Sequence, residues 1–191
     1  MEPTAFSKWN FEMRLTGHTD VELKDIFKVC FKVSASSSIQ WLQYRILHRI
    51  VPVKYYLKKI KILDNDICTL CNNECETILH AFFMCENVQC IWNDLSLHIY
   101  NTTSKRIGFN AKNVIFGEVP FSYQSLVINF IILYAKQYIF SCFKCGKMPN
   151  LIGLINFLKM NYNVEKYISV KNATVDKFNS FWEQWKAVLE I

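Results

Sequence analysis

The strongest constraint on this chain is a cluster of metal-binding side chains within 18 residues. Cys68 and Cys71 are separated by two residues, so both thiols can face one ion from a single tight turn. His80 and Cys85 follow at a spacing of five, at the expected end of a helix. Three thiolates and one imidazole make a closed tetrahedral Zn²⁺ site of the structural kind. We therefore predict that these side chains bind zinc in a small insertion of the fold.

Other cysteines leave alternatives open for this site. Cys75 also lies shortly before His80 and competes as a ligand, although we favour a spare cysteine on the loop. Cys142 and Cys145 repeat the spacing of the first pair and would complete a four-cysteine site with it. Their position at an aromatic-rich helix end favours core or unpaired cysteines. The clustered cysteines would need no metal at all if they were only small buried apolar residues.

The scarcity of helix-breaking residues favours an all-α fold. The chain has 191 residues, of which 51% are apolar, only 5 are Gly and 4 are Pro. Apolar residues recur at helical spacing, as at Leu42, Ile46 and Ile50. We predict helical bundles, with helices near residues 19–33, 39–50, 53–61, 76–84, 87–100, 122 or 125 to 143, 150–162 and 174–189. A capping box at Thr19–Glu22 opens the first helix, and Val114–Gly117 is expected to be extended or a turn.

A polar connection at residues 101–112 divides the predicted fold into two lobes. Residues 1–100 would form a helical zinc-binding lobe with its core at 39–100, and residues 113–191 a C-terminal helical lobe. The most apolar run, residues 126–135, is shorter than the roughly 20 residues that cross a bilayer. We therefore expect a buried helix there and no membrane association.

The cysteines also bear on the cellular compartment. The first residues lack the apolar segment of a secretory signal, so we expect a reducing, intracellular location, in the nucleus or the cytoplasm. Free or metal-bound thiols are then expected in place of disulfides.

The net charge of +6 comes from one short segment. Residues 1–40 carry five basic and five acidic side chains, and residues 62–191 carry eleven of each. The segment between them has no acid and six basic residues, which we call the basic stripe: Arg45, Arg49, Lys54, Lys58, Lys59 and Lys61. Such a stripe is the expected footprint of a phosphate-binding surface, so RNA or DNA is the predicted partner. The alternative is an ordinary solvated helix face.

Aromatic side chains accompany the basic stripe. Trp41, Tyr55 and Tyr56 would stack on unpaired bases if they were exposed. Large aromatic residues are more often part of a core, so we expect these three to be buried.

The order of these residues resembles the zinc-binding region of reverse transcriptases from LINE-type (non-LTR) retrotransposons. The resemblance is carried by Trp41, Arg45-Ile46, Pro52, Leu57, Ile62, Cys68-x-x-Cys71, Glu76-Thr-Ile-Leu-His80, Cys85 and Trp92. It is specific over residues 40–92 and diffuse over most of the remaining chain.

The resemblance implies zinc ligands at Cys68, Cys71, His80 and Cys85, in a region that binds RNA or DNA beyond the polymerase of a larger polyprotein. It also implies that Glu76, one helical turn before His80, accepts a hydrogen bond from the imidazole nitrogen that does not bind the metal. The reverse transcriptase portion of the parent element is then a candidate second partner.

No polymerase or endonuclease activity is expected of this chain. A polymerase needs paired carboxylates that hold two metal ions, and the sequence contains no Asp-Asp pair. The predicted function is a zinc-stabilised nucleic-acid-binding module that is not an enzyme. The alternatives are a structural or protein-interaction remnant of a retrotransposon, and a zinc hydrolase, against which four filled ligand positions argue.

Overall fold

The computed structural model describes residues 8–9, 20–118 and 123–190, and this part of the chain is all-α, as predicted. Its α-helices are α2 (Asp20–Val33), α3 (Ser37–Leu47), α4 (Lys54–Lys59), α5 (Glu86–Thr103), α6 (Ala111–Phe116), α7 (Tyr123–Cys145), α8 (Leu151–Lys171) and α9 (Val175–Trp182). A π-helical turn, His80–Met84, precedes α5, and a 3₁₀ turn, Lys186–Leu189, follows α9. The described residues form one isolated β-bridge, between Ile67 and Cys75.

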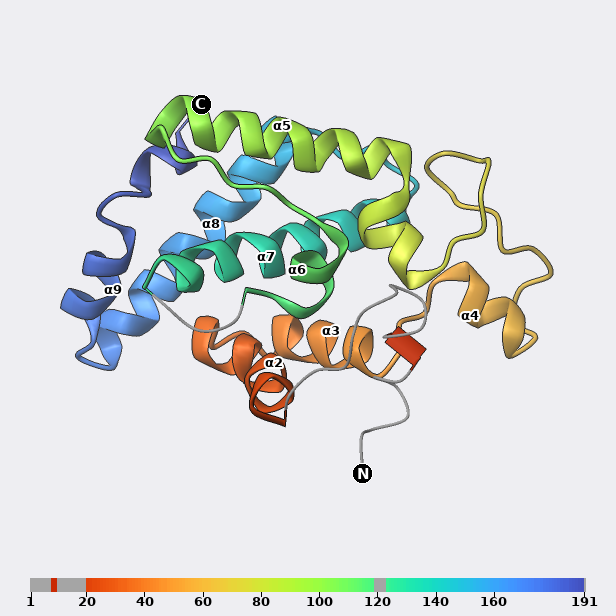
Figure 1. Ribbon diagram of the computed structural model, residues 1–191, viewed down its shortest axis with the longest axis horizontal. Helices are drawn as coiled ribbons and strands as arrows, with labels where there is room; N and C mark the ends of the chain where they lie inside the picture. The colour runs from red at the N-terminus through yellow and green to blue at the C-terminus, as the bar shows by residue number, and fades with distance from the viewer. Residues whose placement is uncertain (1–7, 10–19, 119–122, 191) are drawn as a thin grey trace.

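Helix α7 runs through the middle of the molecule, with α2 and α3 on one side and α5 on the other (Figure 1). Residues 127–136 are buried without interruption, as expected of a helix covered on all sides. By length and composition alone, residues 125–145 could cross a membrane. This stretch is longer than the apolar run of 126–135 on which the sequence prediction rested. However, 72% of the most apolar part of this helix is buried inside the fold, and that burial accounts for its apolar composition.

Buried residues on both sides of the 101–112 connection belong to one hydrophobic core. Polar contacts also join the two halves of the chain. The buried carboxylate of Glu165, on α8, accepts hydrogen bonds from the Ser34 hydroxyl at 2.6 Å and the Tyr134 hydroxyl at 2.8 Å. The two halves are therefore in direct contact, and a division into two lobes stays a prediction.

Several element boundaries differ from the prediction. The segment Val114–Phe116, expected to be extended or a turn, belongs to helix α6. A reciprocal capping box starts α6, because the Asn110 and Asn113 side chains each accept the other's backbone N–H, at 3.0 and 2.8 Å. The helix expected at 76–84 begins two residues later, at Ile78, and is π-helical over His80–Met84. The side chains of the Thr19–Glu22 capping box, and Ser122, lie outside the described residues.

Candidate metal centre

The segment between α4 and α5, which we call the metal loop (residues 66–85), brings Cys68, Cys71, His80 and Cys85 together. Their ligand atoms all lie within 4.8 Å of one another. The Cys68 and Cys85 sulfurs are 3.9 Å apart, and the Cys71 sulfur is 3.4 Å from Nε2 of His80. In a tetrahedral zinc site, bond lengths of 2.0–2.3 Å put two sulfurs about 3.8 Å apart and a sulfur and a nitrogen about 3.6 Å apart. The donor atoms therefore fit a zinc ion.

The first two ligand residues lie on a tight turn. The backbone N–H groups of Leu70 and Cys71 point at the Cys68 sulfur, at 3.4 and 3.5 Å. The Cys68 N–H donates to the Glu74 carbonyl at 2.8 Å, which closes the base of the turn. Donors aimed at a sulfur favour its thiolate, the form that binds metal.

The other two ligand residues flank the π-helical turn. Residues five apart on a regular α-helix lie about 140° apart around its axis, so the two side chains would diverge. Here the Cys85 N–H donates to the His80 carbonyl at 2.9 Å, the five-residue hydrogen bond of a π turn. This wider turn directs His80 and Cys85 to the same point.

Glu74, not Glu76, holds the imidazole of His80. Its carboxylate lies 3.0 Å from Nδ1 of His80, while Nε2 faces the Cys71 sulfur. A carboxylate on one ring nitrogen fixes the tautomer that presents the other nitrogen to a metal. The predicted hydrogen bond from His80 to Glu76 is therefore wrong. It assumed a helical turn between the two residues, whereas this stretch starts as a loop.

Glu76 instead joins the metal loop to α4. Its buried carboxylate accepts hydrogen bonds from the backbone N–H groups of Lys54 at 3.0 Å and Thr69 at 3.2 Å. Its backbone carbonyl accepts the N–H of Tyr55 at 3.2 Å. The first N–H groups of a helix have no partner within that helix. Glu76 supplies those partners and fixes the start of α4 beside Cys68.

Burial and mutual proximity hold most of these thiols in the neutral form. Burial raises the pKa of Cys68, and burial together with the neighbouring Cys68 raises the pKa of Cys85 to about 12. Burial also acts to raise the pKa of Cys71, but backbone N–H groups at Glu74 and Asn73 contribute to a pKa below its ordinary value. A divalent cation bound here would lower the pKa of these thiols, because its positive charge stabilises the thiolate form.

The rival cysteines lie outside the cluster. The Cys75 thiol donates to the Asp66 carboxylate at 3.4 Å, and burial and this carboxylate raise the pKa of Cys75 to about 11. Cys142 is buried near the end of α7, and Cys145 is exposed at its last residue. Among the described residues, the group of His, Cys, Asp or Glu side chains placed to hold a metal is Cys68, Cys71, His80 and Cys85.

Residues 7–92 match the family model described as zinc-binding in reverse transcriptase. The match includes the four clustered residues and the whole basic stripe, and it covers less than half of the chain. No curated protein matches the chain. The resemblance inferred from residues 40–92 is thus confirmed for the reverse transcriptase zinc-binding region, while its LINE-type origin stays a prediction.

Part of the basic stripe has partners within the protein. Lys58 pairs with Asp66 at 2.8 Å, and this hydrogen bond raises the pKa of Lys58 and lowers that of Asp66. The Lys54 ammonium donates to the carbonyl of Ile67 at 2.8 Å. These two lysines therefore connect α4 to the metal loop, and less of their charge is available to a ligand.

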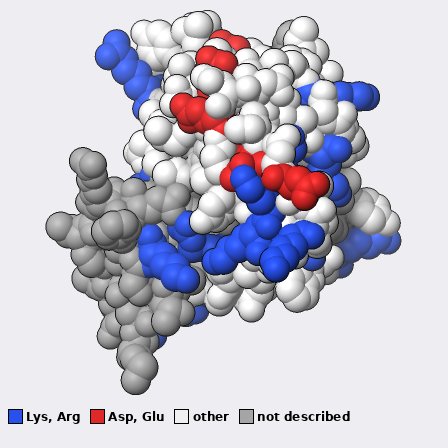
Figure 2. Space-filling view, turned by 90° about the vertical axis from the view of Figure 1, so that its right-hand side faces the viewer, with Lys and Arg blue, Asp and Glu red and all other residues white. Residues whose placement is uncertain are grey.

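The remaining members of the stripe lie at different places. Arg45 is exposed on α3 and lines a groove with Lys144 of α7. Arg49 and Lys59 line a cavity between α3 and α4, and Lys61 is exposed just after α4. Figure 2 shows that Lys and Arg side chains gather in a band across the lower half of the face that carries α4. Of the basic stripe, Lys59 and Lys61 are exposed together at the end of α4, and we call this part of the molecule the basic surface.

The aromatic residues of this segment do not all lie in the core. Trp41 is 58% exposed and Tyr55 is 47% exposed, so the expectation of burial is wrong for both. Tyr56 is partly buried and packs against the core. The Trp41 and Tyr55 side chains are therefore accessible from solvent.

Proposed function

We propose that this chain is a zinc-stabilised nucleic-acid-binding module from the C-terminal region of a LINE-type reverse transcriptase, with no enzymatic activity of its own. The observation that carries the proposal is the position of Glu76, which ties the metal loop to α4. Zinc, when bound, supplies four coordinate bonds that hold the metal loop. Glu76 passes that rigidity to α4, so that Lys59 on this helix and Lys61 just after it bind RNA or DNA in the nucleus or the cytoplasm.

The zinc part of the proposal is tested by elemental analysis of protein purified without chelator. We expect close to one zinc per chain, and loss of zinc when Cys71 or His80 is replaced by Ala. Cys75→Ala is the matched control, since its thiol faces Asp66 and not the cluster. Full zinc content in Cys85→Ala together with loss in Cys75→Ala would show that the wrong fourth ligand was chosen.

The nucleic-acid part is tested by binding at several salt concentrations to single-stranded RNA, duplex DNA and a structured 3′-end RNA. Each neutralised phosphate releases a counterion, so the logarithm of affinity falls with the logarithm of salt. With roughly three to five phosphates contacted, we expect a slope between about −2 and −4. An affinity that does not change with salt contradicts the proposal.

Charge reversal assigns that binding to the surface beside the metal loop. We expect Lys59→Glu with Lys61→Glu to weaken binding to all sequences alike, because phosphate contacts carry no sequence information. The matched control is Lys112→Glu with Lys159→Glu, which makes the same change of charge at exposed positions on α6 and α8. Equal losses in both double variants would show only a general charge effect.

A protein partner is the second candidate, and exposed apolar residues favour it. They lie around the two ends of α4 and in the metal loop, at Ile50, Ile60, Ile62, Leu63 and Ile67. Such a group is typical of a surface that docks on another protein, here the polymerase of the parent element. Ile62→Ser with Leu63→Ser should then abolish association with that polymerase and leave nucleic-acid binding unchanged.

A further inference from the structure

A groove with a volume of about 370 Å³ lies between α3 and α7. It is lined by Ser38, Trp41, Leu42 and Arg45 of α3 and by Gln137, Phe140, Ser141 and Lys144 of α7. In both sets the positions are three, four and seven residues from the first, so each set occupies one face of its helix. The volume lies within the range of protein sites that hold a small organic ligand.

Trp41 presents an open aromatic surface at this groove. It is 58% exposed, whereas the other four tryptophans of the chain are at most 3% exposed. Its indole makes a T-shaped contact with the ring of Tyr44, with ring centres 5.6 Å apart and planes at 84°. In this geometry Tyr44 covers at most one face of the indole. Every nucleobase has a face that stacks on such a ring, whatever its identity.

Two cations from different helices lie at the same groove. Arg45 is exposed one helical turn after Trp41, and side chains four apart on a helix are neighbours. Lys144 is exposed in the last turn of α7, with its ammonium 5.9 Å from the centre of the Phe140 ring. A positively charged groove with an exposed aromatic ring is the combination that binds single-stranded nucleic acid, because cations contact phosphates and the ring contacts bases.

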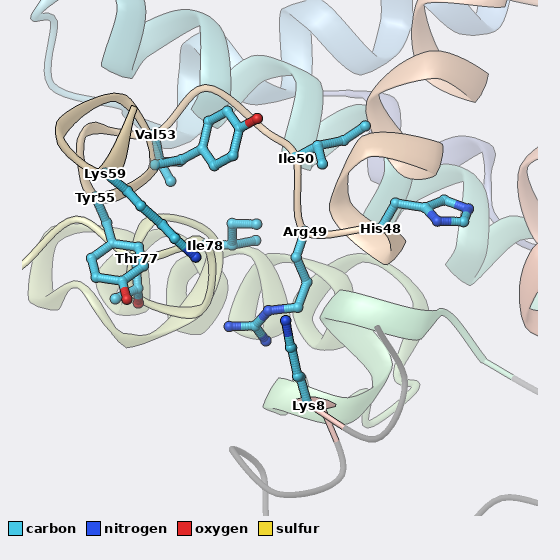
Figure 3. A pocket seen from close by; sticks show the side chains of 10 residues that line it. Lys8, His48, Arg49, Ile50, Val53, Tyr55, Lys59, Thr77 and Ile78 are labelled. Atoms are coloured by element: carbon cyan, nitrogen blue, oxygen red, sulfur yellow. The ribbon is translucent and has the colours of Figure 1, made fainter. Parts of the chain in front are cut away.

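The groove ends near the metal loop. Helices α3 and α7 both run toward this loop in Figure 1, and a Cβ at Gly146, just beyond α7, would be 3.9 Å from the methyl group of Thr69. Residues 48–53 connect α3 to α4, and Figure 3 shows Lys59 reaching back from α4 toward this connection. The end of the groove that carries Arg45 and Lys144 is therefore the end nearer to the basic surface.

We propose that this groove binds one unpaired base of a single-stranded nucleic acid, stacked on Trp41, with the adjacent phosphates held by Arg45 and Lys144. The inference rests on the proposed function and deepens it, because it names single strands as the ligand and gives them a site on α3 and α7. A base within a duplex is already stacked and paired, so it does not reach the indole. The strand continues from the groove to Lys59 and Lys61 of the basic surface.

The test compares wild type with Trp41→Leu on three probes: a twelve-nucleotide single-stranded RNA, the same strand with abasic sites, and the matching duplex. Base–aromatic stacking is worth roughly tenfold in affinity, so we expect Trp41→Leu to bind the normal strand about tenfold more weakly. Its affinity for the abasic strand and the duplex stays unchanged. Trp41→Phe keeps an aromatic face and should retain most of the affinity. Tyr167→Leu is the control, since this exposed tyrosine lies on α8 and does not line the groove.

Tryptophan fluorescence gives a second readout of the stacked base. Because the other tryptophans are buried, we expect the normal strand to quench the emission of wild type through Trp41 and to leave the emission of Trp41→Leu unchanged. The abasic strand should quench neither protein. Quenching of equal size in both proteins overturns the stacking on Trp41.

The phosphate contacts have their own measurement. Arg45→Gln and Lys144→Gln are each expected to make the salt slope for the normal strand less steep by about 0.7, the effect of one lost phosphate contact on a single strand. Lys159→Gln, at an exposed position on α8, is the control and should keep the wild-type slope. Equal zinc content and an equal unfolding midpoint exclude a folding defect in each variant. An unchanged slope in either groove variant shows that its cation holds no phosphate and overturns the proposed placement.

The remaining outcomes separate this inference from the proposed function. If Trp41→Leu binds the normal strand as well as wild type does, or loses affinity equally on all probes, the groove does not hold a base, although nucleic-acid binding stands. If polyglutamate displaces the strand as well as an unlabelled strand of equal charge does, the groove takes acidic peptides and the proposal is overturned. If wild type binds no probe, both the proposed function and this inference are wrong.

Discussion

At the residue scale, the two glutamates of the metal loop have different roles although they are two positions apart. Glu74 is exposed and reaches only the imidazole of His80, whereas Glu76 is buried and bonds to backbone on two segments. Glu74 therefore acts on the metal ligand, and Glu76 acts on the fold around it. Replacing each of them should change a different measured quantity.

We predict that Glu74→Gln weakens zinc binding by roughly 10- to 100-fold, because Nδ1 of His80 then faces a neutral amide in place of a carboxylate. Competition with a chromophoric zinc chelator at neutral pH measures the change. Glu86→Gln, at the exposed start of α5, is the control and should bind zinc as wild type does. Equal affinities in the two variants would show that the carboxylate of Glu74 does not tune the site.

The ligand residues could be predicted from the sequence because their spacing is local and the choice of zinc-binding side chains is narrow. The partner of His80 could not. Whether Glu74 or Glu76 reaches the ring depends on the backbone path of residues 72–77, and a helical turn there was the simplest assumption. The exposure of Trp41 and Tyr55 was missed for a related reason, since burial depends on which distant elements cover a helix face.

At the element scale, α4 is too short to be stable alone. It has six residues, and an isolated helix of that length is not stable in water. Its first N–H groups bond to Glu76, and Lys54 and Lys58 bond to the metal loop. The helix that presents the basic surface therefore depends on the metal loop, and through it on the zinc that we propose binds there.

We predict that removing zinc with a chelator exposes the backbone of residues 54–61 and 68–85 and leaves α7 and α8 protected. Hydrogen–deuterium exchange followed by mass spectrometry, on loaded and chelated protein, measures this. Peptides from α8 serve as the internal control. Unchanged exchange across α4 would mean that its order does not depend on the metal, and uniform loss of protection would mean that the whole fold does.

The positions of most helices followed from the apolar pattern, but α6 did not. Val114, Ile115 and Phe116 are β-branched or aromatic residues, which favour strands when taken alone. The reciprocal contacts of Asn110 and Asn113 start a helix in spite of this. A capping box of two asparagines is a weaker sequence signal than the usual Ser or Thr with Glu, so it was not recognised.

At the scale of the whole molecule, one core encloses a charged group. Lys136, on α7, is 1% exposed, and its ammonium donates to the side-chain oxygen of Gln43 at 2.5 Å. Burial lowers the pKa of Lys136 to about 7, although the nearby Cys30 acts in the opposite direction. The unfolded chain, with a lysine pKa of 10.5, binds this proton more readily than the folded protein does above pH 7.

Lys136 should therefore make stability rise with pH above 7 and have no such effect below it. We predict that the free energy of unfolding of wild type, relative to Lys136→Met, increases by about 1.4 kcal/mol per unit between pH 7 and pH 9. Urea denaturation of zinc-saturated protein at pH 6, 7, 8 and 9 measures the difference. Lys159→Met, at an exposed position on α8, should show no slope, and a flat difference for Lys136→Met would show that its pKa is not lowered.

The sequence was sufficient to predict an all-α chain and a buried helix near residues 126–135, because both follow from local composition and period. It was not sufficient to show that this helix packs against both halves of the chain. Contacts such as Ser34 with Glu165 join residues more than a hundred positions apart, and no local pattern records them. A polar connection looks the same in a sequence whether or not the segments on its two sides share a core.

The Cys68 and Cys85 sulfurs, 3.9 Å apart, are placed for oxidation as well as for coordination. In the absence of a metal, an oxidant that accepts two electrons and two protons from these thiols would join them in a disulfide. That bond would consume two of the four donor atoms and leave no room for a tetrahedral ion. Exposure to air during preparation would then fix a fraction of the chains in a form that added zinc cannot restore until a reductant is supplied.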